Sequence, residues 1–388
     1  MMRDFALEVY FSKWEFAAKH HLTASDAQSM SVSELLGYAS AFDRERFHNL
    51  HLGYTETFGA KPLLGEIAKT FDTITQSDVL CFAGAEEGVY VAMRVLLTPG
   101  DHCIVITPNY QAAETIPLAI CAVTGVALDP DDNWSLDLDA IRSAIRPNTK
   151  LISINFPNNP TGAIPPRAIF DSLVELCRTN GIWLFSDEVY RLIERDPSLR
   201  LPQAADVYER GISLNVMSKS YGLPGLRIGW LACQDRQLLV ACERYKHYLS
   251  ICNAGPSEVL AEIALKAREA ILSRNRGIIG DNLNLLDGFF ADFPELFDWR
   301  QPDGSCVAFV RYKGGDGVER FTERLVQESG VLLLPSSIYR SELGPVPQDY
   351  FRIGFGRSGM DQGLAVFGDW LTRNRDKANV LGGKRQAS

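Results

Sequence analysis

No part of the 388-residue sequence approaches the ~18 consecutive apolar residues that a helix needs to span a bilayer. The N-terminus also lacks the uninterrupted apolar core of a signal peptide, because the charged residues Lys13 and Glu15 follow soon after Met1. We find neither an internal repeat nor a low-complexity linker. The sequence therefore predicts a cytoplasmic protein with no membrane partner.

Metal-binding and disulfide patterns are missing as well. The eight cysteines form no C-x-x-C pair and have no histidine at ligand spacing, so we expect no metal site and small buried thiols in a reducing compartment. The net charge of −9 disfavours nucleic acid as the main partner. A local basic pocket that holds a phosphate remains compatible with this charge.

Apolar runs alternate with helical patterns between residues 79 and 249. We expect strands at 79–83, 103–107, 151–156, 183–186, 212–217 and 226–232, and helices at 87–97, 168–179 and 236–248. This alternation predicts an α/β fold with βαβ units around a mainly parallel sheet. Polar clusters follow several of these strands, and ligands bind beyond the carboxyl ends of strands in such sheets.

The chain length suggests one large domain and a smaller one. The first ~50 residues look mostly helical, and strand-like runs recur at 306–312 and 350–354 beyond the alternating region. We expect a large domain over 50–282 and a smaller α+β domain that combines 1–49 with 283–388. The last dozen residues are expected to be frayed.

The most informative segment is residues 218–230, which read S-K-S-Y-G-L-P-G-L-R-I-G-W. Arg227 follows Lys219 after eight residues, and three glycines in the segment allow close approach of the backbone. A lysine can hold a carbonyl cofactor covalently, and a guanidinium group suits its phosphate. Alone, Lys219 would be interpreted as a surface lysine, but together with Arg227 it predicts a site for pyridoxal phosphate.

Other polar motifs lie where strands are expected to end. They are G-A-E-E-G at 84–88, P-N-Y at 108–110, N-F-P-N-N-P-T-G at 155–162 and S-D-E-V-Y at 186–190. Each has a structural alternative: a turn for the asparagine motif, a helix cap for Asp187 and a core position for Tyr110. Arg352, between apolar neighbours in Y-F-R-I-G-F, needs an anion, which is either a substrate carboxylate or a structural salt-bridge partner.

From about residue 53 to about 354, these motifs resemble in sequence order the fold-type I pyridoxal-phosphate enzymes of the class I and II aminotransferase family. The resemblance implies a mainly parallel seven-stranded sheet flanked by helices. It matches Lys219 to the lysine that forms an aldimine with the cofactor, and Arg227 and Ser218 to phosphate-binding residues. The family commonly has a hydroxyl residue three positions before the lysine, where this sequence has Val216.

The resemblance also assigns the cofactor ring. It matches Asp187 to the carboxylate beside the ring nitrogen, which keeps that nitrogen protonated. Tyr190 and Asn159 match residues that hydrogen-bond the phenolic oxygen, and Asn159 is also placed at the substrate. Tyr110 matches the aromatic side chain that stacks on the ring.

Three further expectations concern the phosphate and the subunits. Gly84, Ala85 and Glu86 match a cup of main-chain N–H donors for the phosphate. A carboxylate there would be repelled by the phosphate, so the Glu86 side chain should point away or be paired. Tyr54 matches a tyrosine that reaches the phosphate of the neighbouring subunit, which implies a homodimer with shared sites.

Arg352 matches the arginine that binds the substrate carboxylate, so the resemblance implies amino-acid and 2-keto-acid substrates, with Lys219, Asp187 and Tyr190 as catalytic residues of a transamination. A lyase or cyclase is the alternative, because residues 218–230 and the F-S-K-W-E-F run at 11–16 also resemble capreomycidine-synthase-like enzymes. A non-catalytic regulator is disfavoured, because only ~50 residues, without a basic recognition helix, precede the family-like region.

The sequence identifies the substrate side-chain pocket least well. Ser25, Tyr248 and Asn253 are candidate residues for that pocket. Glu15 and Asp26 could meet a basic substrate, but charged residues near the surface of helices are more often simply solvated, and we favour that interpretation.

Overall fold

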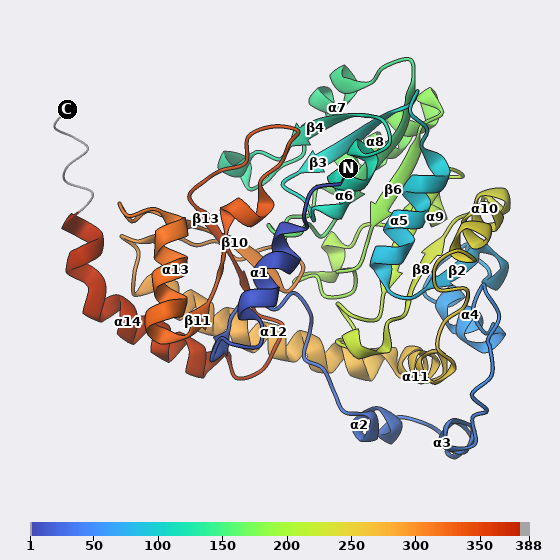
Figure 1. Ribbon diagram of the computed structural model, residues 1–388, viewed down its shortest axis with the longest axis horizontal. Helices are drawn as coiled ribbons and strands as arrows, with labels where there is room; N and C mark the ends of the chain where they lie inside the picture. Colours follow the sequence, from blue (N-terminus) through green and yellow to red (C-terminus); the bar gives the residue numbers. More distant parts are fainter. Residues whose placement is uncertain (1, 381–388) are drawn as a thin grey trace.

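The computed structural model describes residues 2–380 (Figure 1). Its α-helices are α1 Ala6–Trp14, α2 Val32–Gly37, α3 Ala41–His48, α4 Lys61–Ala68, α5 Ala85–Leu96, α6 Ala112–Leu118, α7 Leu138–Ala144, α8 Arg167–Asn180, α9 Ala204–Val207, α10 Arg236–Lys246, α11 Gly255–Lys266, α12 Arg268–Ala291, α13 Val318–Ser329 and α14 Met360–Val380. Its strands are β1 His20–His21, β2 Val79–Phe82, β3 His102–Thr107, β4 Ala122–Ala127, β5 Thr149–Asn155, β6 Trp183–Asp187, β7 Gly211–Val216, β8 Gly229–Ala232, β9 Phe297–Asp298, β10 Val307–Tyr312, β11 Val331–Leu332, β12 Leu334–Pro335 and β13 Tyr350–Gly354.

A seven-stranded sheet forms the centre of the larger part, in the order β2-β8-β7-β6-β5-β3-β4. Neighbouring strands are parallel except at β8, which is antiparallel to both β2 and β7. This confirms the predicted α/β fold and the mainly parallel sheet. The sequence did not predict β4, because only one residue of this edge strand is buried and the strand lacks a clear apolar pattern.

The sheet brings the motifs of the sequence to one edge. Strands β2, β3, β5, β6 and β7 all end there, and the reversed strand β8 begins there. The expected strand at 226–232 was too long, because 224–226 form a 3-10 turn and Arg227 has a left-handed φ of 51°. Arg227 therefore lies at the edge where the Lys219 loop leaves β7, although the two residues flank different strands.

The C-terminal part is built on an antiparallel sheet in the order β12-β13-β10-β9. Helices α13 and α14 lie beside this sheet (Figure 1). Strand β1 pairs in parallel with β11, so part of the N-terminal segment is joined to the C-terminal part. The N-terminal segment is less helical than expected, because residues 15–31 contain no helix. The division into 50–282 and 1–49 plus 283–388 stays a prediction.

Helix α12 has 24 residues and runs beneath both parts of the molecule (Figure 1). In its first half, the Asn275 side chain donates to the carbonyl of Ser220 at 2.8 Å, just after Lys219. In its second half, Asn282 donates to the carbonyls of Phe355 and Arg357 at 2.8 and 2.7 Å. The predicted domain boundary after residue 282 thus falls within a continuous helix that holds both sides.

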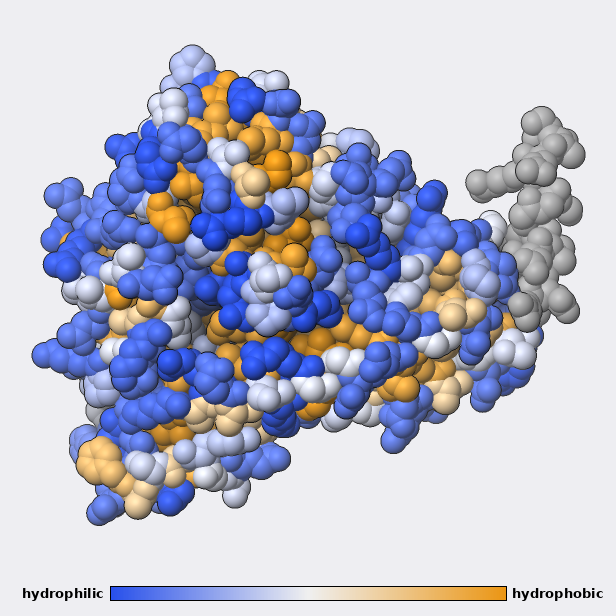
Figure 2. Space-filling model, turned by 180° about the vertical axis from the view of Figure 1, so that it is seen from behind, coloured by the Kyte–Doolittle hydropathy of each residue, from blue (hydrophilic) through white to orange (hydrophobic). Residues whose placement is uncertain are grey.

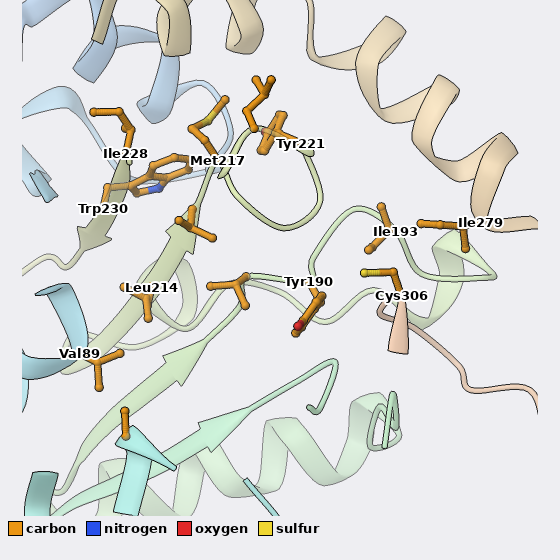
Figure 3. Packing of buried hydrophobic residues seen from close by; sticks show 14 of the residues in the cluster. Val89, Tyr190, Ile193, Leu214, Met217, Tyr221, Ile228, Trp230, Ile279 and Cys306 are labelled. Atoms are coloured by element: carbon orange, nitrogen blue, oxygen red, sulfur yellow. The ribbon is translucent and has the colours of Figure 1, made fainter. Parts of the chain in front are cut away.

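The central sheet is covered by apolar side chains on both faces. Leu214 of β7 and Trp230 of β8 are buried in a core that also contains Val89 of α5 (Figure 3). The eight cysteines are free thiols, and six of them are buried. No helix among residues 2–380 is long and apolar enough to cross a membrane. Helix α14 extends to Val380, and the rest of the tail that was predicted to be frayed lies outside the described residues.

Candidate active site

A cavity with about 750 Å³ of empty space opens at the edge of the sheet where these motifs meet. The carboxyl ends of the strands in an α/β sheet are the usual position of a site for a small molecule or cofactor. The residues around it come from α1, α5, β5, β6 and the loops after β3, β5, β6 and β7: Glu8, Ala85, Glu86, Val89, Tyr110, Asn155, Asn159, Asp187, Val189, Tyr190, Ser218, Lys219 and Arg227. Most of the residues singled out in the sequence therefore line one cavity.

Lys219 is held at the wall of this cavity by the segment that precedes α2. Its Nζ donates to the hydroxyl of Ser25 at 2.8 Å, and it lies 5.9 Å from the centre of the Tyr190 ring. Burial lowers the pKa of Lys219; the carboxylate of Asp26 opposes this shift, and the guanidinium of Arg352 adds to it. A lysine with a lowered pKa is suited to imine chemistry, because only the neutral amine is nucleophilic.

Asp187 ends β6 with its carboxyl group facing the cavity. Burial raises its pKa to about 6, although a hydrogen bond from the Val189 N–H and the nearby Lys219 charge both favour the ionised form. No helix follows Asp187, so the helix-cap alternative was wrong. Asn155 donates to the Asp187 carbonyl at 3.0 Å and accepts from the Asn159 N–H at 2.8 Å, which fixes the two residues relative to each other.

Tyr190 is 1% exposed, and its hydroxyl has no hydrogen-bond partner among the described residues. Figure 3 shows its ring close to Cys306, at the end of the apolar core. Burial raises the pKa of Tyr190 well above its ordinary value, so the hydroxyl remains a donor at neutral pH. A buried hydroxyl without a partner is costly in a folded protein, which indicates that a ligand atom is meant to accept from it.

Arg352 is completely buried on β13. Its Nη1 donates to the Asn159 side-chain oxygen at 3.1 Å, and its Nη2 donates to the Thr23 carbonyl at 2.7 Å. The Nε atom has no partner, and no carboxylate among the described residues forms an ion pair with this guanidinium. The structural salt-bridge alternative was therefore wrong, and an unneutralised buried charge predicts an anionic ligand.

The start of α5 and Arg227 form a cradle for an anion. The first N–H groups of a helix have no partner within it, and here they follow Gly84, which has a φ of 95°. A Cβ atom on Gly84 would lie 2.2 Å from Nη2 of Arg227, so only glycine lets the guanidinium approach the loop. Gly229 lets the backbone of β8 approach the start of α5, because a Cβ there would lie 2.8 Å from the Ala85 nitrogen.

We expected the Glu86 side chain either to point away from the site or to be paired; Glu86 lines the cavity, at a solvent-exposed position, and its carboxyl group is hydrogen-bonded to Tyr110. Burial of the cavity wall raises the pKa of Glu86 to about 7, and the carboxylates of Asp187 and Glu8 add to the shift. A hydrogen bond with Tyr110 acts in the opposite direction.

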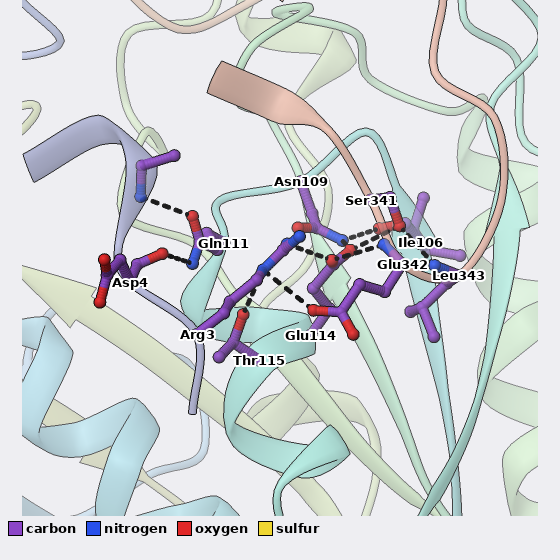
Figure 4. Close-up of polar contacts among 11 residues, drawn as sticks. Arg3, Asp4, Ile106, Asn109, Gln111, Glu114, Thr115, Ser341, Glu342 and Leu343 are labelled. Carbon is purple, nitrogen blue, oxygen red and sulfur yellow. Dashed lines mark hydrogen bonds and ion pairs between the residues drawn. The ribbon is translucent and has the colours of Figure 1, made fainter. Parts of the chain in front are cut away.

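Helix α1 supplies residues that the sequence did not predict for the site. Phe5 lies against Tyr110 with a ring-centroid distance of 5.1 Å, and Glu8 lines the cavity. The start of the chain is anchored by Arg3, which pairs with the buried Glu114 at 2.5 Å (Figure 4). Gln111 accepts from the Ala6 N–H at 2.9 Å. Long-range packing brings α1 to the cavity. No local motif in the sequence marks Phe5 or Glu8 as site residues.

Several other candidates lie away from the cavity of this chain. Tyr54 and Tyr248 are 93% and 90% exposed, and Asn253 is buried where its side chain donates to Glu258. Val216 belongs to the apolar core and does not line the cavity. Asp26 is buried outside any helix and pairs with Arg357 at 2.9 Å, so our favoured interpretation of it as a solvated helix charge was wrong.

The residues present fit a phosphorylated pyridine aldehyde. The cradle of α5 and Arg227 suits a phosphate, the carboxyl group of Asp187 suits a ring nitrogen, and the unpartnered Tyr190 hydroxyl suits a phenolic oxygen. The Lys219 amine suits an imine, and the buried Arg352 guanidinium, which has no counter-ion among the described residues, suits a carboxylate.

Comparisons with known proteins agree with this chemistry. Arginine–pyruvate transaminase AruH of Pseudomonas aeruginosa is 29% identical over 332 residues, which cover 81% of this chain and 80% of that protein. Capreomycidine synthase of Streptomyces vinaceus is 27% identical over 370 residues, which cover 94% and 93%. The crystal structure of a PLP-dependent aminotransferase from Streptococcus suis is 30% identical, with a TM-score of 0.89 over 96% of this chain and 98% of that one.

The model of the family described as aminotransferase class I and II matches residues 38–365. That range includes every residue that the resemblance assigned to the cofactor and to the substrate carboxylate, and all seven strands of the central sheet. The family implies pyridoxal phosphate as the cofactor and amino and keto acids as substrates. The chain therefore belongs to the class I and II aminotransferase family and is a pyridoxal-phosphate-dependent transaminase.

Proposed function

We propose that Lys219 holds the pyridoxal phosphate covalently and that Arg352 selects the α-carboxylate of an amino acid and of a 2-keto acid. The observation that carries this proposal is the buried, unpaired guanidinium of Arg352, which shares Asn159 with the cavity of Lys219. A carboxylate would satisfy its free donors in the bidentate geometry that arginine favours. The bound substrate would then lie between these two cations.

In this proposal, different residues bind the phosphate, the ring and the phenolic oxygen of the cofactor. The main-chain N–H groups of Gly84, Ala85 and Glu86, with Ser218 and Arg227, would hold the phosphate. Asp187 would keep the ring nitrogen protonated, and Tyr110 would stack on the ring. Asn159 and Tyr190 would donate to the phenolic oxygen. When bound, the cofactor supplies an electron sink for the bond that breaks at Cα.

The protein contributes proton transfer and orientation. With the cofactor bound, the free Lys219 amine would act as the base that removes the Cα proton of the substrate and as the acid that returns a proton to the substrate–cofactor adduct. Arg352 fixes the carboxylate, so that the Cα–H bond points at the amine. Asp187 remains ionised throughout, since a pKa of about 6 leaves it mostly deprotonated at neutral pH when the site is empty.

We also propose that the enzyme works as a homodimer with shared sites. Tyr54 and Leu52 are 93% and 81% exposed, and Tyr248 and Ile251 are 90% and 50% exposed. The two segments lie side by side, because Thr55 donates to the Asn253 carbonyl at 2.9 Å. Hydrophobic side chains also interrupt the polar surface on the back of the molecule (Figure 2). A second copy would cover the exposed 52–54 and 248–251 segments and would bring Tyr54 to the neighbouring phosphate.

Elimination with cyclisation is the second candidate. Capreomycidine synthase matches 94% of the chain, which is more than the range matched by the family model. The same proton removal at Cα by Lys219 could be followed by loss of a β-substituent in place of protonation. Transamination is favoured, because the family and the transaminase relatives point to it.

The test begins with purified protein and added pyridoxal phosphate. We expect a visible absorbance band that is lost in Lys219→Ala, and a panel of amino acids should bleach this band and yield the matching keto acids by mass spectrometry. Arg352→Lys serves as the control that keeps the charge but not the planar fork. A colourless wild type would refute the proposed function, and release of ammonia or water without amino transfer would establish the lyase.

A further inference from the structure

The segment 23–28 crosses the active site and touches both ends of the proposed substrate position. The Thr23 carbonyl accepts from Nη2 of Arg352 at 2.7 Å, and the Ala27 N–H donates to the Lys219 carbonyl at 3.0 Å. Between these contacts, the Ser25 hydroxyl accepts from Nζ of Lys219 at 2.8 Å. One short piece of chain is therefore bonded to the residue that would bind the carboxylate and to the residue that would carry the proton.

Segment 23–28 is fixed by an ion pair, by close packing and by burial. Asp26 accepts from Nε and Nη2 of Arg357 at 3.1 and 2.9 Å, in a bidentate pair. Gly222 lies so close that a Cβ atom on it would be 2.5 Å from the Gln28 carbonyl oxygen. The side chains of Thr23 and Ala27 are fully buried. Ser25 consequently has a fixed position opposite the Lys219 amine.

The Ser25 hydroxyl lies among the polar groups of the site. It also opposes the rise in the pKa of Tyr190 that burial causes, although the two hydroxyl groups do not meet the geometry of a hydrogen bond. A hydroxyl both accepts and donates, so it can bond to the ammonium form and to the neutral form of a lysine. Lys219 has no other side-chain hydrogen-bond partner among the described residues.

We propose that Ser25 is a further catalytic residue of this enzyme, and the proposal rests on the proposed role of Lys219. Its hydroxyl holds the free Nζ so that the lone pair points at the substrate Cα. In the step itself, the Cα–H bond breaks, an N–H bond forms on Nζ, and the electron pair stays with the carbon. Ser25 accepts from one of the other two N–H groups of Nζ and gives up no proton of its own.

The first experiment uses the cofactor-free protein. Formaldehyde and cyanoborohydride label neutral lysine amines, and the labelling of the Lys219 peptide is followed against pH by mass spectrometry. A hydroxyl that accepts from the ammonium form raises the lysine pKa, so Ser25→Ala should move the midpoint down by about one pH unit. Ser25→Thr keeps the hydroxyl and should not move it. Ser358→Ala is the matched control, because the Ser358 hydroxyl bonds to Gln28 and not to Lys219.

The second experiment uses the enzyme loaded with cofactor and an amino acid deuterated at Cα. We expect Ser25→Ala to lower kcat about 10- to 100-fold with KM changed less than threefold, to increase the isotope effect, and to leave the cofactor absorbance intact. Ser25→Thr should recover most of the loss. Wild-type kcat, isotope effect and labelling midpoint in Ser25→Ala would overturn the inference, whereas absence of any turnover in the wild type would overturn the proposed function itself.

Discussion

At the scale of single residues, the site contains buried polar groups that lack a hydrogen-bond partner or a counter-ion within the protein. The Tyr190 hydroxyl has no partner among the described residues, and the buried guanidinium of Arg352 has neither a counter-ion nor a partner for Nε among them. Such groups reduce the stability of the folded chain unless a ligand completes them. Binding of the cofactor and of a carboxylate should therefore stabilise the protein as well as enable the reaction.

Arg352→Met is expected to separate stability from activity. Removing a buried, unpaired charge relieves a desolvation cost, so the Tm of the cofactor-free protein should stay within a few degrees of the wild type or rise. The specificity constant for amino acids should fall about 100-fold, because a bidentate charged hydrogen bond contributes roughly 3 kcal/mol. Calorimetry and steady-state kinetics measure the two effects. A large drop in Tm would contradict this account and indicate a structural role for Arg352.

Glu86→Gln should change cofactor affinity in a way that depends on pH. The pKa of Glu86 is raised to about 7, so its carboxyl group is mostly neutral at about pH 6 and mostly charged at about pH 8. Gln should therefore bind pyridoxal phosphate several-fold more tightly than Glu at the higher pH and equally at the lower pH. Absorbance titrations of the cofactor-free protein measure this. Equal affinities at both values would mean that Glu86 does not face the phosphate.

At the scale of elements, the central sheet could be predicted well because its strands are buried and β-branched. The clustering of the motifs after β2, β3, β5, β6 and β7 could be predicted from the rule that parallel strands end at one edge of the sheet. Edge strand β4 and the paths of α1 and of segment 23–28 could not be predicted, because long-range packing fixes them. Ser25 carried only a weak signal in the sequence, and its contact with Lys219 spans 194 positions.

Helix α1 is expected to depend on its few anchors. Arg3 bonds to Glu114 and also to Thr115, which joins the start of the chain to α6 (Figure 4). Arg3→Ala leaves the buried Glu114 without this cation, and it should speed hydrogen exchange in residues 5–14 at least about tenfold. The global Tm should change by only a few degrees, since α1 buries little apolar surface apart from Leu7. Arg142→Ala, which changes an exposed arginine of α7, is the control.

At the scale of the whole molecule, the proposed dimer predicts complementation between inactive variants. If Tyr54 completes the site of the neighbouring subunit, Lys219→Ala and Tyr54→Ala homodimers should both have low activity. A hybrid of the two subunits contains one site with an intact Lys219 and an intact Tyr54. After unfolding and refolding of an equal mixture, activity should return to about a quarter of the wild-type value. No recovery, although hybrids form, would show that Tyr54 acts within its own subunit.

Helix α12 connects the two sides of the site. Its contact to Ser220 is made by Asn275, and its contacts to the β13 side are made by Asn282. Gly277 and Gly280 lie between them, and a Cβ atom on either would meet no neighbouring atom within 4 Å, so crowding does not require glycine there. Each glycine costs the helix about 1 kcal/mol relative to alanine. Two weak helix formers thus lie between the contact behind Lys219 and the contacts to the chain after β13. We expect alanine at both positions to raise the Tm and, because it stiffens this stretch, to slow any closure of the site around its substrate.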